Sequence, residues 1–148
     1  MNRALIVFAL ALATASFWPS DVAAESIVEP ATVKSQGGAV TVEAKYLGAS
    51  PAGAGDTIRF EIKLDTHSVN LDEYDLMQRA TLRNDRGVAV KPLSFEKEGS
   101  GHHVQHVLAF PATDGSGNFV VGAGATAIEL VLTDIANVPQ RVLRWQVQ

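Results

Sequence analysis

The feature that most constrains the fold is a strict alternation of apolar and polar residues from residue 57 to residue 65. In an extended chain Ile58, Phe60, Ile62 and Leu64 lie on one face, and the polar or charged residues between them lie on the other. A period of two is typical of a β-strand that packs one face on a core and turns the other to water. The segment therefore predicts a half-buried strand in a sheet with a polar outer face.

Similar patterns recur along the chain and are separated by turn signals. Asn84-Asp85-Arg86-Gly87 has the composition of a hairpin turn in which Gly87 takes a positive φ. Pro92 indicates that the strand returning from this turn lies at a sheet edge or contains a bulge. Further strands are expected at 40–46, 76–83, 88–95, 102–110, 128–133 and 143–147, loops or turns at 48–56, 96–101 and 134–140, and a short helix is an alternative over 71–79.

About seven short strands with turns between them are typical of an antiparallel sandwich of the immunoglobulin-like or fibronectin-like kind. We expect a single all-β domain over residues 39–148, with the loop at 48–56 connecting strands across the sandwich. The chain contains no cysteine, so the disulfide that joins the sheets of many such domains is absent and the core alone must stabilise the fold.

The N-terminus has the organisation of a secretory signal peptide. A positive Met1-Asn2-Arg3 precedes an apolar run, and small residues at Val22-Ala23-Ala24 fit a cleavage site after Ala24. The apolar run is shorter than the roughly 20 residues that a spanning helix needs, so no membrane anchor is expected after cleavage. We therefore expect a signal peptide at 1–24, a leader or linker at 25–38, and a soluble periplasmic or secreted protein.

The charge balance bears on the partners. A formal net charge of −4 gives no basic surface for nucleic acid or for an anionic membrane, so neither is an expected partner.

A stretch from Phe60 to Pro111 resembles an uncharacterised family of exported prokaryotic β-sandwich domains. The resemblance is carried by Leu64-Asp65-Thr66-His67-Ser68-Val69-Asn70-Leu71, Tyr74-Asp75-Leu76, Asn84-Asp85-Arg86-Gly87, Gly101-His102-His103 and Leu108-Ala109-Phe110-Pro111. It implies no activity. It does imply that His67 and the His102-His103 pair belong to one pattern, to which His106 does not belong.

The histidines suggest a metal site at one end of the sandwich. His67 follows a strand and His102 and His103 begin another, so end loops can bring them together with Asp65, and Asp72 or Asp75 could complete the set. Nitrogen and oxygen ligands of this kind suit copper(II) or zinc.

Each of these features also has a purely structural explanation. In that alternative His67 and His103 bond loop backbone, and His106 packs, hydrogen-bonded, beside Val104 and Leu108. The neighbouring acidic loop, Asn70, Asp72, Glu73 and Asp75, lacks the pattern of an EF-hand and is interpreted as a solvated loop rather than a calcium site.

No nucleophile elbow or phosphate-binding loop is recognisable, so the sequence predicts a protein that is not an enzyme. Two hypotheses remain. One is an exported binding module that holds copper(II) or zinc through His67, His102, His103 and Asp65. The other is a structural or protein-interaction domain that docks on an envelope protein through sheet edges or end loops.

Overall fold

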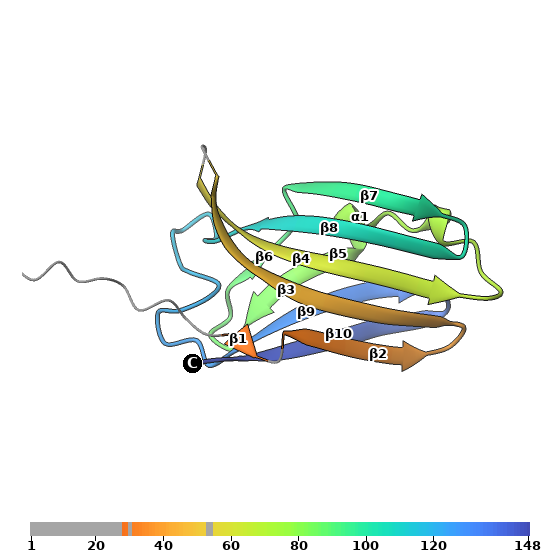
Figure 1. Cartoon of the computed structure of the whole chain (residues 1–148). Helices are drawn as coiled ribbons and strands as arrows, with labels where there is room; N and C mark the ends of the chain where they lie inside the picture. The colour runs from red at the N-terminus through yellow and green to blue at the C-terminus, as the bar shows by residue number, and fades with distance from the viewer. Residues whose placement is uncertain (1–27, 30, 53–54) are drawn as a thin grey trace, which may run out of the picture.

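The computed structural model describes residues 28–29, 31–52 and 55–148 and folds them into a sandwich of two antiparallel sheets with five strands each (Figure 1). This confirms the predicted all-β class, whereas the expected signal peptide lies outside the described residues. The 3₁₀ turn η1 (Leu71–Glu73) and helix α1 (Leu76–Arg79) lie between β4 and β5. The strands are β1 (Val28–Glu29), β2 (Thr32–Gly37), β3 (Val40–Ala52), β4 (Gly55–Thr66), β5 (Ala80–Asn84), β6 (Ala89–Val90), β7 (Ser94–Ser100), β8 (His103–Pro111), β9 (Ala127–Ile135) and β10 (Val138–Val147).

The strand order is that of an immunoglobulin-like sandwich. One sheet has the order β2-β3-β4-β8-β7 and the other has the order β1-β10-β9-β5-β6. When β3, β4, β7 and β8 are equated with strands A, B, D and E, the first sheet contains the order A-B-E-D. When β5, β6, β9 and β10 are equated with C, C′, F and G, the second contains the order C′-C-F-G. β1 and β2 are additional edge strands, one on each sheet.

The core forms where the alternating strands face each other. Ile58, Phe60, Ile62 and Leu64 of β4 are all almost completely buried, as their spacing predicts. Phe60 packs against Trp145 of the opposite sheet, with ring centroids 4.9 Å apart. It also makes edge contacts with Tyr46 and Phe110 of its own sheet, at 5.4 and 6.0 Å. An aromatic cluster therefore joins the two layers of a domain that has no disulfide.

The N-terminal boundary of the domain differs from the expectation. The sequence predicts a leader over 25–38, but β1 pairs with β10 and the whole of β2 pairs with β3. Arg141 of β10, almost fully buried, donates hydrogen bonds to the carbonyls of Ser35 and Gly37 in β2. Because β2 has no fully buried side chain, it lacks an apolar period that could reveal it. Residues from Val28 on therefore already pair with the sandwich, and the expected start at Ala39 falls in the turn between β2 and β3.

The prediction of a loop at 48–56 is also wrong. β3 and β4 continue to pair as far as Ala52 and Gly55, so they form one long hairpin within a single sheet and do not cross between sheets. The register shifts between Tyr46 and Gly48, and Gly48 has a φ of 97°. A bulge of this kind bends a strand, and Figure 1 shows the distal part of the hairpin rising away from the sandwich.

The strand expected at 88–95 is divided between the two sheets. β6 contains only Ala89 and Val90, the buried Pro92 follows, and the chain then crosses to the other sheet as β7. The polar turn expected at 96–101 is therefore largely a strand. Every side chain of β7 is exposed, so its sequence carries no alternation of buried and exposed positions.

Two further segments are shorter than expected. The strand expected at 76–83 begins only at Ala80, because residues 76–79 form α1. Together, η1 and α1 agree with the alternative prediction of a short helix over 71–79. The connector expected at 134–140 is reduced to a tight turn at Ala136 and Asn137, whose φ values are 51° and 62°. Positive φ at both positions is typical of a type I′ hairpin turn.

Removal of residues 25–38 tests the revised boundary. We expect the truncated protein to lose about 3 kcal/mol or more in free energy of unfolding, because the Arg141 guanidinium would lose the carbonyls of Ser35 and Gly37 that accept its hydrogen bonds. Urea denaturation of the truncated and complete proteins measures the difference. In an Arg141→Leu background the truncation should be less costly. Equal stability of the truncated and complete proteins would show that 25–38 is only a linker.

Candidate functional site

The β4–β8 ladder brings one predicted pair of site residues together. Asp65 and His103 are direct cross-strand partners at the end of β4 and the start of β8. Nδ1 of His103 lies 2.7 Å from Oδ1 of Asp65, and since a carboxylate only accepts, the imidazole donates this hydrogen bond. Both side chains are more than half exposed. The bond leaves Nε2 of His103 with a free lone pair.

The other two predicted ligands are placed differently. The ring of His67 lies beside that of His103 in an edge arrangement, with centroids 6.5 Å apart. His102 occupies the turn between β7 and β8, where its carbonyl accepts a hydrogen bond from the amide of Thr66. Within the described residues no group of three His, Cys, Asp or Glu side chains is arranged to hold a metal ion. The predicted metal set therefore stays a prediction, with Asp65, His67 and His103 close together.

The acidic loop has structural roles. Asn70 accepts a hydrogen bond from the amide of Asp72 at the start of η1, and Asp75 accepts one from Met77 at the start of α1. Asp72 binds the Lys97 ammonium at 2.6 Å and the amide of Gly101 at 3.0 Å. These two contacts, the Lys97 bond first, lower the pKa of the Asp72 carboxyl. The loop therefore fastens the η1–α1 segment to the β7–β8 hairpin.

His106 is buried beside Val104 and Leu108 on the inner face of β8, as expected, and is only 3% exposed. Neither ring nitrogen, however, has a hydrogen-bond partner among the described residues. Burial lowers the pKa of the imidazole, as does the nearby Lys97 charge, while Asp75 acts in the opposite direction. The predicted position is thus confirmed, but the predicted hydrogen bonding is not present in the described protein.

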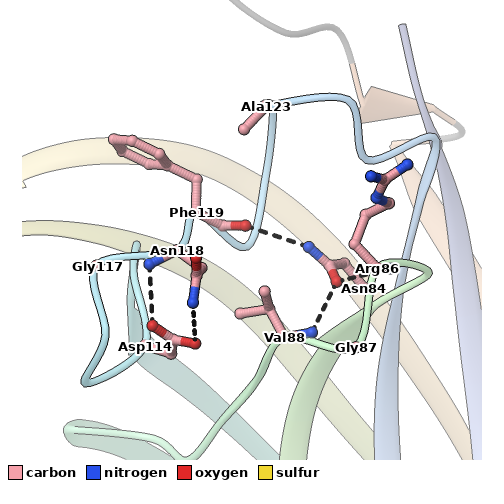
Figure 2. A pocket seen from close by; sticks show the side chains of 9 residues that line it. All are labelled: Asn84, Arg86, Gly87, Val88, Asp114, Gly117, Asn118, Phe119 and Ala123. Atoms are coloured by element: carbon pink, nitrogen blue, oxygen red, sulfur yellow. Dashed lines mark hydrogen bonds between the residues drawn. The ribbon is translucent and has the colours of Figure 1, made fainter.

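A separate cavity of about 500 Å³ opens at the C-terminal end of β5, away from α1. It lies between the β5–β6 turn and the long connection from β8 to β9 (Figure 2). The lining residues are Asn84, Arg86, Gly87, Val88, Asp114, Gly117, Asn118, Phe119 and Ala123.

Asn84 holds the two segments of this cavity together. Its buried amide nitrogen donates to the carbonyls of Phe119 and Val120 at 3.2 and 3.1 Å. Its amide oxygen accepts from the backbone amides of Arg86 and Val88 at 2.9 and 3.0 Å. One side chain therefore fixes both the turn and the connection, so the cavity walls are preformed (Figure 2).

The carboxylates around the cavity are occupied by local donors. Asp114 accepts from the amides of Ser116 and Asn118 and from the Asn118 side chain, and these bonds, the side-chain bond first, lower its pKa. Asp85 accepts from the hydroxyl and the amide of Thr126, and its pKa is also lowered, chiefly by the hydroxyl.

Arg86 differs from these carboxylates. Its exposed side chain rises from the turn toward the loop that carries Ala123 (Figure 2). In the part of the chain that the structure describes, its guanidinium has no hydrogen-bond or ion-pair partner. A guanidinium in this state can bind a carboxylate or phosphate with two parallel hydrogen bonds.

The sequence predicts Asn84-Asp85-Arg86-Gly87 only as a turn, with no role in a site. Asn84-Asp85-Arg86-Gly87 and Asp114-Gly115-Ser116-Gly117-Asn118 both begin with a residue whose side chain bonds the backbone two residues later. This Asx-turn signature was available in the sequence. What the sequence does not contain is the contact between the two turns, which are far apart along the chain.

Comparison with known proteins gives no match to a protein-family model, a curated protein or a solved structure. The resemblance over Phe60 to Pro111 therefore remains a prediction. Among the described residues, no helix has the length and apolar character that crossing a membrane requires.

The unpartnered imidazole predicts a pH effect. Because burial lowers the pKa of folded His106, the unfolded chain takes up the proton first as the pH falls below about 6.5. The free energy of unfolding should therefore decrease from pH 7 to pH 5, and His106→Leu should reduce this decrease. Urea denaturation at several pH values measures both slopes. Identical slopes in the two proteins would contradict the assignment to His106.

Proposed function

We propose that the protein is an exported, non-enzymatic binding module that holds an anionic ligand in the cavity between the β5–β6 turn and the β8–β9 connection. The observation that carries the proposal is the contrast between Arg86 and its neighbours. The Arg86 guanidinium has its hydrogen-bonding capacity free within the described structure, whereas Asn84 and Asp114 use theirs to shape the walls. The lining also carries the Asp114 carboxylate, but its oxygens accept hydrogen bonds from Ser116 and Asn118. Arg86 is therefore the charged group of the described lining with free donors, and it favours a ligand with a carboxylate or phosphate group.

The state of Asp114 supports binding without catalysis. Three hydrogen bonds stabilise its charged form and lower its pKa, so it is a poor proton acceptor at neutral pH. Val88 and Ala123 provide apolar surface beside Arg86. The lining therefore combines anion recognition with room for a small apolar group. Export to a periplasm or beyond is part of the proposal and rests on the N-terminal sequence.

Benzoate and benzamide test this proposal, because they have the same ring and differ in charge. We expect benzoate to bind roughly ten times more tightly than benzamide, through a charge-assisted bond to Arg86. Ligand-detected NMR on protein purified from exporting cells measures both affinities. Arg86→Gln should reduce benzoate binding to the level of benzamide.

Arg59→Gln serves as the matched control, because Arg59 lies on β4 outside the lining of this cavity. Its benzoate affinity should equal that of the wild type. Equal binding of the two probes, or benzoate binding that survives Arg86→Gln, would contradict the proposal.

A second candidate function is metal binding, which the Asp65–His103 hydrogen bond favours. Metal-binding histidines commonly donate their second ring nitrogen to a carboxylate, which orients the ring and leaves the other nitrogen for the metal. The ring of His67 lies next to His103 and can supply a second nitrogen. Copper(II) or zinc would fit such ligands, with water completing the coordination.

Calorimetric titration with copper(II) and zinc tests this candidate. We expect micromolar binding that a His67→Ala/His103→Ala double variant loses. His102→Ala should retain the binding if the site consists of Asp65, His67 and His103, and should weaken it if His102 is a ligand. No binding heat with the wild type, or equal heat with the double variant, would exclude the metal function.

A further inference from the structure

The segment η1–α1 and the edge of the β7–β8 hairpin enclose a second cavity. Lys97 of β7 is the cross-strand partner of His106, and Phe95 is the partner of the buried Leu108. Cross-strand partners point to the same side of a sheet, so Phe95, Lys97 and His106 all project toward the inner face. Asp72 closes the other side through its bonds to Lys97 and Gly101. The cavity between them has a volume of about 220 Å³.

His106 is the part of this cavity that lacks a partner. Its imidazole lines the cavity, is 97% buried, and has no hydrogen bond at either nitrogen within the described structure. A buried polar group without a partner destabilises a fold, and most such groups in proteins are paired. Both nitrogens are shielded from solvent, so an occupant that donates a hydrogen bond would satisfy the nitrogen with the lone pair after the ring turns toward the cavity.

The charges around the cavity select the sign of that occupant. Lys97 is neutralised by Asp72, with which it forms a 2.6 Å ion pair. Glu73 and Asp75 remain and give the lining a net negative charge. An anion is therefore disfavoured, and a group that donates hydrogen bonds and carries a positive charge is favoured.

The aromatic walls select the kind of cation. Tyr74 and Phe95 line the cavity, but the guanidinium of Arg79 already lies over the Tyr74 ring, 5.4 Å from its centroid. The ring of Phe95 lies 6.2 Å from that of His106 and half of its surface is exposed, so Phe95 offers the available aromatic face. Aromatic faces attract ammonium and guanidinium groups and also pack against an aliphatic stem. A bare metal ion could not use this apolar surface.

We propose that this cavity binds an alkylammonium or guanidinium group, which is held by His106, by the carboxylate of Glu73 and by the ring of Phe95. Asp75, whose two oxygens accept from Met77 and Gln78, adds negative charge to the lining. The group can belong to a free amine or to a lysine or arginine side chain of a partner chain. In the described structure β7 pairs only with β8, so a partner strand can add along its other edge and place such a side chain at the cavity. The site is separate from the Arg86 cavity, which lies at the other end of β5.

Titration of the exported protein with Nα-acetyl-lysine methylamide and Nα-acetyl-arginine methylamide tests the proposal. The norleucine and citrulline analogues serve as uncharged counterparts. We expect the charged probes to shift the His106 ring signals in NMR spectra and to bind roughly tenfold more tightly than the uncharged ones.

Two variants assign the site. Glu73→Gln should weaken the charged probes selectively, and His106→Leu should abolish the preference for charge while the protein stays folded. Arg86→Gln should bind these probes like the wild type, which separates this proposal from the function proposed above.

A short peptide with one lysine between β-forming residues distinguishes the two sources of the group. A partner strand is the source if the peptide binds at least tenfold more tightly than the single-residue probe and shifts the backbone amides of β7. Equal affinity indicates a free amine, and both results support the proposed site. Equal binding of charged and uncharged probes, or no shift of His106 with any probe, would overturn it and leave the cavity as a water-filled space.

Discussion

The contact between Phe60 and Trp145 is the interaction on which the rest of the structure depends. It joins strands from the two sheets, and with Phe110 and Tyr46 it fills the middle of a sandwich that has no disulfide. Both anchoring residues are completely buried. Because the layers are fixed in the middle by packing alone, the loops at the two ends can carry polar groups that contribute little to the core. The Arg86 cavity and the Asp65–His103 pair lie in those loops or at the strand ends that meet them.

The fold class could be predicted because the central strands alternate regularly. The buried face of β4 is visible in the sequence, and so is that of β8, apart from His106. The edge strands could not be predicted in the same way. β7 contains only exposed side chains and β2 contains only exposed or partly buried ones, because each is an edge strand that pairs with a single neighbour. Alternation reports burial rather than backbone pairing, so strands without a buried face look like loops.

The candidate sites, too, could be predicted only where a local sequence pattern reports them. The proximity of His103 to Asp65 and His67 follows from the clustering of loops at the ends of a sandwich, and the sequence predicts it as a hypothesis. The Arg86 cavity requires the turn after β5 to meet the connection before β9 through Asn84, a contact that no local pattern encodes. His106 could be placed on the inner face by alternation. The lack of partners for its nitrogens depends on three-dimensional packing and became visible only in the structure.

The charges of β7 affect whether two copies of this domain can pair along that strand. Two copies that paired along this strand in antiparallel fashion with full overlap would place Lys97 opposite Lys97 and Glu96 opposite Glu98. Like charges directly opposite each other destabilise a strand pair. Self-association along β7 is therefore opposed, although the strand is long and its edge is open in the described structure. The edge therefore discriminates against homotypic aggregation at high local concentration without being covered in the described structure.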